Sequence, residues 1–376
     1  MHRETAGGRS PSGGLLAVHA HPDDETLATG GLLATWADAG RPVTVVTCTR
    51  GELGEVIGTA LAHLEGDGPA LAAHRERELA GALAALGVTD HVFLDAVPDG
   101  VFLDAVPDGV VLDAVPDGVA PDAVPDGDLP GPPARFSDSG MAWAGIGRAG
   151  RVADLPDGAF VAVPLDAAAR RLARVIRERR PDVVVTYEPG GGYGHPDHVR
   201  AHDVTIRALE LARDAELDLG GPAHVPGAVL VAVVPADALR AAYRALPELP
   251  AVAALRARDP QFTLPDPDGP LPSVAVAATE VDVVVDVAPV LHRLAAALAA
   301  HATQVRSIAL DADRVAHAVA AGRLGDRTGA VVGCYALSND VLLPVLSTES
   351  YRRVPGAGAG STPEHLTWPD AVHPVA

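Results

Sequence analysis

Apolar runs separated by turn residues dominate the first part of the chain. The run 15–21 predicts a buried strand that ends in a loop. A helix-compatible segment, 26–40, follows and ends at Gly40, and 41–49 is a second buried strand. A strand, a helix and a strand in such a short span form a βαβ unit, which requires a parallel sheet. Leucines at helical spacing then predict a helix over 70–86.

A second unit of the same kind begins near Asp166, which we expect to be the N-cap of a helix that ends before Pro181. Residues 182–189 predict the next strand, 190–198 a Gly-rich loop and 199–214 a helix. Together the two units predict an α/β fold: a Rossmann-like, mostly parallel sheet with helices on both faces.

Composition divides the chain into four parts. Residues 1–13 are rich in Gly, Ser and Pro and predict a disordered N-terminus. Residues 14–218 predict the Rossmann-like core. Residues 219–350 are interrupted by Pro but contain a strand-like run at 281–287, and they predict a smaller C-terminal α+β part packed on the core. The remainder, 351–376, predicts a flexible tail.

The core contains a nonapeptide repeat over residues 92–127. VFLDAVPDG occurs at 92–100 and again at 101–109, followed by VVLDAVPDG (110–118) and VAPDAVPDG (119–127). One interpretation is a calcium-binding coil, because some calcium β-helices use a nine-residue period. The repeat lacks the Gly-rich unit of those coils. We therefore favour a tandem duplication forming a surface loop insertion, because a longer loop costs little free energy.

The formal net charge of −20 changes the range of partners. Nucleic-acid binders need a basic surface that displaces counterions from phosphates, and an anionic membrane surface attracts basic segments. The charge therefore argues against both. The N-terminus has no apolar signal core, and no uncharged apolar run reaches the ~18 residues of a membrane helix. These features predict a cytoplasmic protein with a small-molecule substrate. The oligomeric state stays open.

Chemistry-bearing side chains gather directly after two predicted strands. HAHPDDE (19–25) supplies two His and three carboxylates, and the loop 190–198 adds a Tyr, two His and an Asp. In open parallel sheets, ligands bind at the carboxyl ends of the strands, where these two motifs can meet. A hydrolytic metal site needs about three protein ligands, a carboxylate that accepts the proton of water and a donor for the oxyanion. The sequence therefore predicts a metal-dependent hydrolase.

HAHPDDE together with GGYGHPDH resembles the PIG-L (LmbE-like) family of zinc-dependent N-deacetylases, which act on N-acetylglucosamine conjugates. Longer segments resemble the branch that deacetylates N-acetylglucosaminyl-inositol in mycothiol biosynthesis. They are VTCTRGELGEVIG (46–58), RERELAGALAALG (75–87), SDSGM (137–141), VIRERRPDVVVTYEPGGGYGHPDHV (175–199) and HATQV (301–305). The resemblance therefore implies an amide hydrolase with an amino-sugar inositol substrate.

The resemblance also assigns the metal site. It implies one zinc per subunit, held by His21, Asp24 and His198, although two His and one carboxylate also suit Fe²⁺. Spacing alone does not say which of the adjacent Asp23 and Asp24 is the ligand. The family pattern gives that role to Asp24.

The remaining catalytic roles follow from the same pattern. Asp23 is implied to be the general base, and His195 the general acid, with Asp197 as its orienting partner. Tyr193 is implied to polarise the acetyl carbonyl. His19 and His202 match no catalytic position, and we expect structural roles for both.

The resemblance further suggests residues that bind the substrate. Arg75 is the best candidate for gripping inositol hydroxyls, because its guanidinium is a fixed fork of donors, unless it is a solvated helix residue. Asp138, Met141 and Glu55 are further candidates. Glu55 also fits a charge at a helix N-terminus, and the repeat makes the positions of Asp138 and Met141 the hardest to carry over.

Two other functions compete with the deacetylase. A sister amidase of the same family cleaves mycothiol S-conjugates with the same metal and catalytic residues. The local sequences GYGHPDH and ETLATGG favour the deacetylase. The third reading, a non-catalytic sugar-binding α/β protein, conflicts with a competent residue at every catalytic position.

Overall fold

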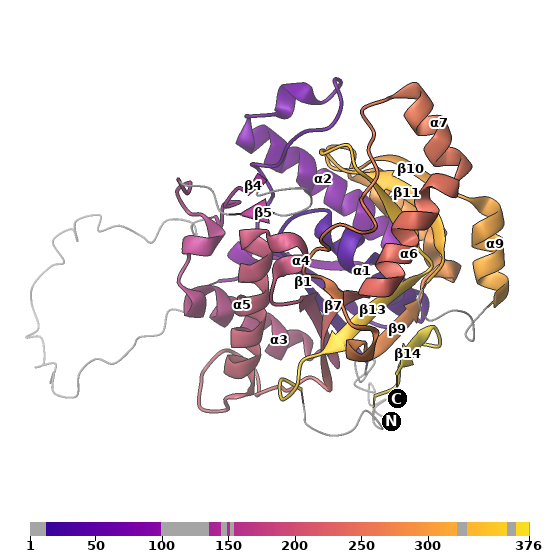
Figure 1. Ribbon diagram of the computed structural model, residues 1–376. Helices are drawn as coiled ribbons and strands as arrows, with labels where there is room; N and C mark the ends of the chain where they lie inside the picture. The colour runs from indigo at the N-terminus through magenta and orange to yellow at the C-terminus, as the bar shows by residue number, and fades with distance from the viewer. Residues whose placement is uncertain are drawn as a thin grey trace, which may run out of the picture.

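The computed structural model describes residues 13–98, 135–143, 149–150, 154–321, 329–358 and 366–375 (Figure 1). The predictions for residues 1–12 and for the repeat copies at 101–127 lie outside the described residues. No helix in the described ranges is long and apolar enough to cross a membrane.

Helices and strands alternate through the first half of the chain. The helices are α1 (Asp24–Asp38), α2 (Gly68–Leu86), α3 (Leu165–Arg179), α4 (Gly191–Gly194), α5 (Pro196–Arg213), α6 (Ala236–Ala245), α7 (Pro250–Arg258), α8 (Leu291–Ala300) and α9 (Ala312–Ala321). The strands are β1 (Leu15–His19), β2 (Val43–Thr47), β3 (Asp90–Phe93), β4 (Ala142–Trp143), β5 (Ala149–Gly150), β6 (Val183–Tyr187), β7 (Ala228–Pro235), β8 (Ala275–Val276), β9 (Val283–Asp286), β10 (Arg306–Leu310), β11 (Val331–Ala336), β12 (Leu342–Leu346), β13 (Thr348–Arg353) and β14 (Val372–Pro374). One local prediction is wrong: the N-cap of α3 is Pro164, and Asp166 lies in the first turn.

The main sheet confirms the predicted α/β fold. Its order is β14-β9-β13-β7-β6-β1-β2-β3, with β8 beside β7. The neighbouring strands β3, β2, β1, β6 and β7 are parallel to one another. Strands β13, β9 and β14 extend the sheet beyond β7 in antiparallel pairs. Strands inside such a sheet are buried on both faces, which is why they are continuous apolar runs.

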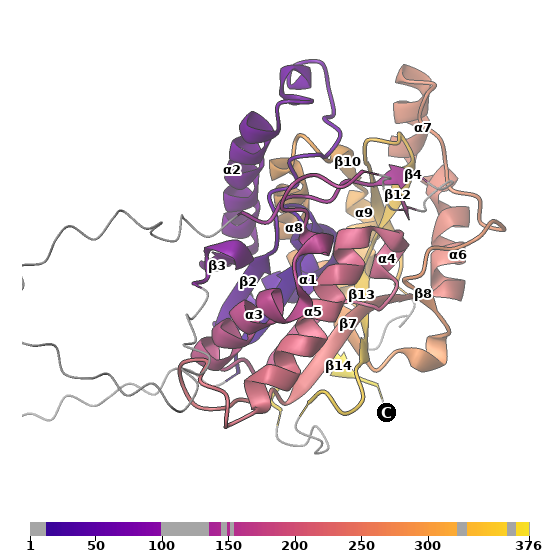
Figure 2. The same ribbon diagram turned by 90° about the vertical axis from the view of Figure 1, so that its left-hand side faces the viewer.

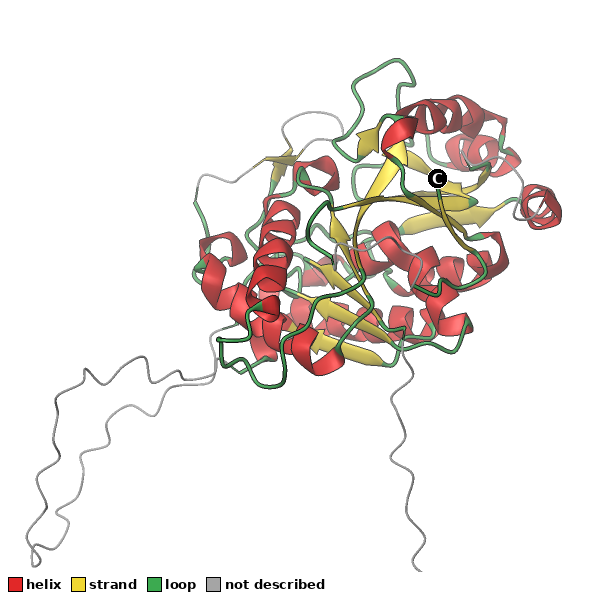
Figure 3. Ribbon diagram, turned by 90° about the horizontal axis from the view of Figure 1, so that it is seen from below, coloured by secondary structure: helices red, strands yellow, loops and turns green. Residues whose placement is uncertain are grey.

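Helices cover both faces of this sheet (Figures 2 and 3). Alternate residues of β1 point to opposite faces, as the period of a strand requires. Leu15 and Ala17 belong to the core cluster that includes residues of α1, α2 and α8, whereas Leu16 and Val18 belong to the cluster that includes residues of α3 and α5. All four side chains are at most 1% exposed, so both layers pack tightly against the strand that carries the first motif.

The C-terminal residues are part of the main sheet, which corrects two predicted boundaries. Within the predicted part 219–350, β7 and β9 lie in the main sheet, and β10, β11 and β12 form a separate antiparallel sheet. The flexible tail predicted over 351–376 is wrong for the strand residues, because β13 pairs with β7 and β9 while β14 pairs with β9. Tyr351 is fully buried in the core.

The first copy of the nonapeptide belongs to the fold, so the predicted insertion does not begin at residue 92. Val92 and Phe93 lie in β3, which pairs with β2. Leu94 is fully buried. Asp95 is 2% exposed, and its carboxylate accepts hydrogen bonds from Arg50 and from the backbone N–H of Phe136. These contacts connect β3 to the segment that resumes at residue 135.

Candidate metal centre and active site

The first motif turns directly from β1 into α1. His21 lies in the turn, and α1 begins at Asp24. The backbone N–H of His21 donates to Asp24 Oδ2 at 2.9 Å, and His21 Nδ1 lies 3.2 Å from the same oxygen. The ring and the carboxylate are thus fixed together by the local chain. Both residues are buried, 6% and 7% exposed.

The second motif reaches the same place from the neighbouring strand. β6 pairs with β1, so their carboxyl ends meet, as predicted. α5 begins directly after His195, whose Nδ1 accepts a hydrogen bond from the backbone N–H of Asp197 at 3.1 Å. His198 lies in the first turn of α5, and its Nε2 is 3.2 Å from Asp24 Oδ1. Asp24 therefore lies between His21 and His198, 3.2 Å from each.

These residues fit a divalent metal ion. His198 Nε2 is buried and makes no hydrogen bond within the described residues, while its Nδ1 lies 3.1 Å from the carbonyl oxygen of Gly191. A His that ligates a metal through one nitrogen typically donates from the other to such an oxygen. Donor atoms of His21, His195 and His198 also lie within 4.8 Å of one another, as do those of His21, Asp138 and Asp197. The cluster of imidazoles and carboxylates suits a transition metal.

The carboxylate of Asp197 does not contact His195 in the way the resemblance implies. Its Oδ2 lies 3.2 Å from His21 Nε2 and accepts a hydrogen bond from the backbone N–H of Ser139 at 2.9 Å. Its Oδ1 accepts one from the Ser139 hydroxyl at 2.5 Å. Only the backbone N–H of Asp197 reaches the His195 ring. Because that N–H occupies Nδ1, the neutral ring of His195 carries its proton on Nε2. Sequence reasoning missed Ser139, which is fully buried.

Asp138, which follows the repeat in the sequence, also lies at the site. Its Oδ1 lies 3.6 Å from His21 Nε2, and its Oδ2 accepts a hydrogen bond from the backbone N–H of Leu53. Burial lowers the pKa of His21, but Asp138, Asp197 and Asp24 outweigh it and raise that pKa well above its ordinary value. The segment after the repeat therefore contributes a carboxylate to the centre.

Asp23 has an unusual backbone conformation beside the candidate metal ligands. Its φ is 110° and its ψ is −33°, which L-residues rarely adopt. Burial raises the pKa of its carboxyl to about 6; the charge of Arg75 opposes this shift, and that of Asp24 adds to it. A carboxylate with such a pKa is suited to accept a proton near neutral pH.

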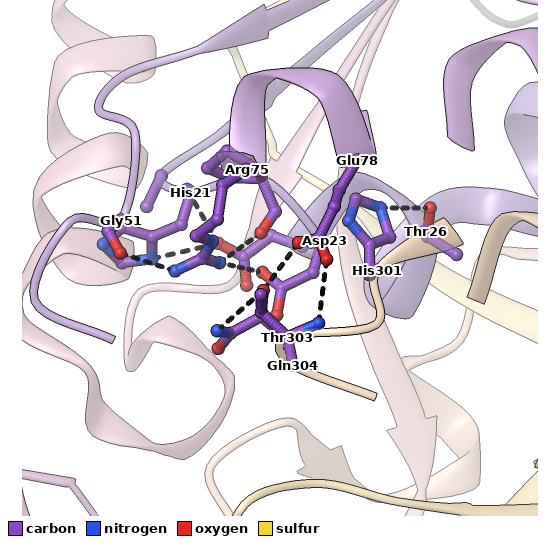
Figure 4. A network of polar contacts seen from close by, with 12 residues as sticks. His21, Asp23, Thr26, Gly51, Arg75, Glu78, His301, Thr303 and Gln304 are labelled. Carbon is purple, nitrogen blue, oxygen red and sulfur yellow. Dashed lines mark hydrogen bonds and ion pairs between the residues drawn. The ribbon is translucent and has the colours of Figure 1, made fainter. Parts of the chain in front are cut away.

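Arg75 points toward the protein rather than toward open solvent (Figure 4). It is 3% exposed. One terminal nitrogen donates to the carbonyl of Gly51 at 2.7 Å, and the other donates to the carbonyl of Pro22 and lies 3.2 Å from Asp23 Oδ1. The guanidinium, predicted to contact inositol, is in this arrangement bonded to the turn that contains Pro22 and Asp23.

Two tyrosines flank His198. The ring of Tyr193 lies edge-on, with centroids 5.1 Å apart, and burial raises the pKa of its hydroxyl. Sequence reasoning missed Tyr187, which stacks on His198 at 4.3 Å and accepts a hydrogen bond from the backbone N–H of Ala20. Burial, together with the charges of His21 and His198, lowers the pKa of His195 well below its ordinary value.

The other predicted residues lie at the margin. Glu55 is exposed, and Met141 is partly buried at the end of the 135–143 segment. His19 contacts the hydroxyl of Thr29 at 2.9 Å, and His202 contacts the carbonyl of Tyr187 at 2.8 Å, as expected of structural residues.

The chain is similar in sequence to a known family and to several named proteins. The PIG-L family profile, described as GlcNAc-PI de-N-acetylase, matches residues 16–209. The protein named 1D-myo-inositol 2-acetamido-2-deoxy-alpha-D-glucopyranoside deacetylase from Kineococcus radiotolerans is 42% identical over 92% of this chain and 78% of its own length. A protein of the same name from Rhodococcus jostii is 37% identical over 91% of this chain and 92% of its own.

A solved deacetylase–teicoplanin complex is 18% identical, with a TM-score of 0.41 over 91% of this chain and 99% of that one.

Proposed function

The chain belongs to the PIG-L family, and from that premise we propose that it is a zinc-dependent deacetylase acting on N-acetylglucosaminyl-inositol. The reaction hydrolyses the acetamide and gives glucosaminyl-inositol and acetate, a step of mycothiol biosynthesis. The proposal rests on relatives that carry this activity in their names and are aligned over most of the chain.

One structural observation supports the metal most directly: the buried, unbonded Nε2 of His198 lies beside Asp24 and His21. We propose that these three side chains hold the ion. Their imidazole and carboxylate donors suit zinc, and two His with one carboxylate would be a set of three protein ligands such as catalytic zinc sites use. When bound, zinc supplies Lewis acidity, which polarises the amide carbonyl and lowers the pKa of water.

The surrounding residues then have distinct tasks. Asp23, whose pKa is about 6, accepts the proton of the attacking water. The Tyr193 hydroxyl keeps its proton at neutral pH, because burial raises its pKa, and it can donate a hydrogen bond to the developing oxyanion. His195, neutral and with its proton on Nε2, donates a hydrogen bond to the leaving amine, and the proton that the amine takes up is the one that Asp23 accepted from water. Asp197 orients His21 through its carboxylate and His195 through its backbone N–H.

The sugar and inositol would lie beyond the metal, where the loop 50–58 and the SDSGM segment (137–141) meet. The bonds from the backbone N–H groups of Leu53 and Asp138 to the carboxylates of Asp138 and Glu52 connect the two loops. We propose Asp138, Met141 and Glu55 as contacts of the substrate at this junction.

Turnover and metal content test the proposal together. The purified, zinc-loaded protein is offered N-acetylglucosaminyl-inositol, N-acetylglucosamine and a mycothiol S-conjugate under one set of conditions. We expect the highest kcat/KM for the first, because remote binding helps position the amide. A preference for the S-conjugate would assign the chain to the sister amidase. If the metal-loaded protein turned over none of the three substrates, the proposal that the chain is an enzyme of this kind would be wrong.

Single substitutions separate the ligands from the base. We expect His21→Ala, Asp24→Ala and His198→Ala to lose metal and activity together. Asp23→Asn should retain metal and lose roughly 10²–10⁴-fold in rate. If Asp23→Asn emptied the site and Asp24→Asn did not, the two roles would be reversed.

A further inference from the structure

The peptide group that joins Pro22 to Asp23 is held at both of its polar ends. Its carbonyl oxygen, on Pro22, accepts a hydrogen bond from Arg75. Its N–H, on Asp23, donates to Glu25 Oε2 at 2.9 Å. A guanidinium on the oxygen and a carboxylate on the N–H oppose any rotation of the peptide plane.

We propose that Arg75, Glu25 and His301 are positioning residues that hold this peptide, and with it the carboxylate of Asp23, in the orientation needed for proton transfer. The proposal rests on the proposed function in one respect, namely that Asp23 is the base. It gives Arg75 a task different from the inositol contact expected from the family resemblance.

We call these three residues the clamp, and the need for it follows from the backbone conformation of Asp23. A non-glycine residue at φ 110° is strained, and such residues persist only where their surroundings determine them strongly. Arg75 restrains the side chain as well, because the nitrogen that bonds the Pro22 carbonyl lies 3.2 Å from Asp23 Oδ1. Adjacent carboxylates can then face different tasks, Asp24 toward the imidazoles and Asp23 toward the guanidinium.

Each half of the clamp is itself anchored. On one side, Glu25 and His301 are fully buried and form an ion pair of 2.8 Å between Oε1 and Nε2. His301 directly follows α8, and the backbone N–H and hydroxyl of Thr303 donate to Glu78 of α2, at 2.8 and 2.6 Å (Figure 4). Residues 301–303 thus brace the first motif from the C-terminal part of the chain.

On the other side, two glycines make room for the guanidinium. A Cβ added at Gly51 would lie 2.1 Å from Nη1 of Arg75, and one at Gly54 would lie 2.7 Å from the same atom. Gly51 also has a φ of +63° and accepts the Nη1 hydrogen bond through its carbonyl. The loop therefore fits closely around Arg75.

The first experiment compares Arg75→Met on two substrates. If Arg75 positions Asp23, kcat should fall about 10- to 100-fold for both N-acetylglucosaminyl-inositol and N-acetylglucosamine, the rate equivalent of the usual strain at such a residue. If Arg75 instead binds inositol, KM should rise for the first substrate alone. The matched control is Arg177→Met: Arg177 is also 3% exposed and bonds backbone carbonyls, those of Ala212 and Leu217, on the other helical layer. It should lose stability with kcat unchanged.

The second experiment removes the other half of the clamp. Glu25→Gln and His301→Ala should lower kcat with KM within about twofold and metal content intact, and His301→Gln, which keeps an N–H donor, should recover part of the loss. The control is Glu349→Gln, because Glu349 is a partly buried carboxylate that accepts from the backbone N–H groups of Gly31 and Leu32 in the middle of α1. It should affect melting temperature but not kcat.

Crystal structures of the variants give a readout independent of turnover. In Arg75→Met and Glu25→Gln we expect the Pro22–Asp23 peptide to rotate and Asp23 to leave its positive φ. Unchanged φ together with wild-type kcat in both variants would overturn the clamp. If the wild-type protein turned over neither substrate, the proposed function would fail, while the peptide orientation would still decide whether the clamp exists.

Discussion

The nonapeptide repeat offers a comparison between identical sequences in different positions. Asp95 and Asp104 occupy the same place in two copies of VFLDAVPDG. In the structure it is Asp95 that accepts from Arg50 and from the N–H of Phe136. We predict that Asp95→Ala destabilises the protein strongly and that Asp104→Ala does not.

The magnitude follows from the partners that lose a contact. Arg50 is 6% exposed, and removing one partner of a buried ion pair typically costs 3–5 kcal/mol. Arg50 keeps a contact to Glu76 at 3.2 Å, which favours the lower end, while the Phe136 N–H loses its acceptor at a cost of about 1 kcal/mol. We therefore expect a loss of about 4 kcal/mol for Asp95→Ala. For Asp104→Ala we expect less than about 0.5 kcal/mol.

Urea unfolding followed by far-UV circular dichroism measures both variants against the parent protein. A loss below about 1 kcal/mol for Asp95→Ala would refute the contacts described for the first copy. Small losses in both single variants and a large loss in the double variant would show that the second copy can replace the first at β3.

Three further predictions concern the fold. Gly31→Ala should lower the free energy of unfolding, measured by heat or urea, by at least about 1–3 kcal/mol, because the added Cβ would lie 2.0 Å from Val287 Cγ1. Its control is Gly81→Ala, where the nearest atom is 3.4 Å away, and this change should be neutral or stabilising. Burial raises the pKa of Asp90, but its bonds to Arg179 and Thr44 outweigh this and lower that pKa below 3.8. The stability that Asp90 contributes is therefore present above pH 3.8 and is lost as the pH falls below that value. Asp90→Asn should cost less than about 1 kcal/mol at pH 7, since the pair is one-third exposed, and the gap to wild type should narrow as the pH is lowered below 3.8. Deleting residues 101–127 should leave melting temperature and deacetylation near wild type, since the copy that pairs with β2 remains; a large drop in either would show that the later copies support the fold or the site.

The meeting of the two motifs was predictable because it follows from a general rule about parallel strands. His21 and Asp24 follow β1, His198 follows β6, and neighbouring parallel strands bring their carboxyl ends together. No local pattern states which distant backbone meets a given side chain. The contact of Glu25 with His301 spans 276 residues, and that of Asp197 with Ser139 spans 58.

The wrong prediction for the tail has a similar cause. Residues 351–376 are rich in Gly and Pro and read locally as a tail. Strands β13 and β14 exist because β9 offers them an edge on either side, which only the assembled sheet reveals. The repeat misled in the opposite direction: identical sequence suggested one role for all copies, whereas Leu94 and Asp95 of the first are buried.

The late positions of His301 and Trp368 in the chain have a consequence for folding during translation. Asp23 and Asp24 leave the ribosome early, yet His301, which braces their turn, is made almost three hundred residues later. Trp368, near the end of the chain, packs edge-on against Trp36 of α1 with centroids 5.8 Å apart. Contacts so distant in sequence form slowly. A nascent chain therefore contains the HPDDE motif (21–25) long before the contacts with His301 can form. A product truncated at residue 218 would contain every proposed metal ligand but would lack these contacts, and its site would not be competent.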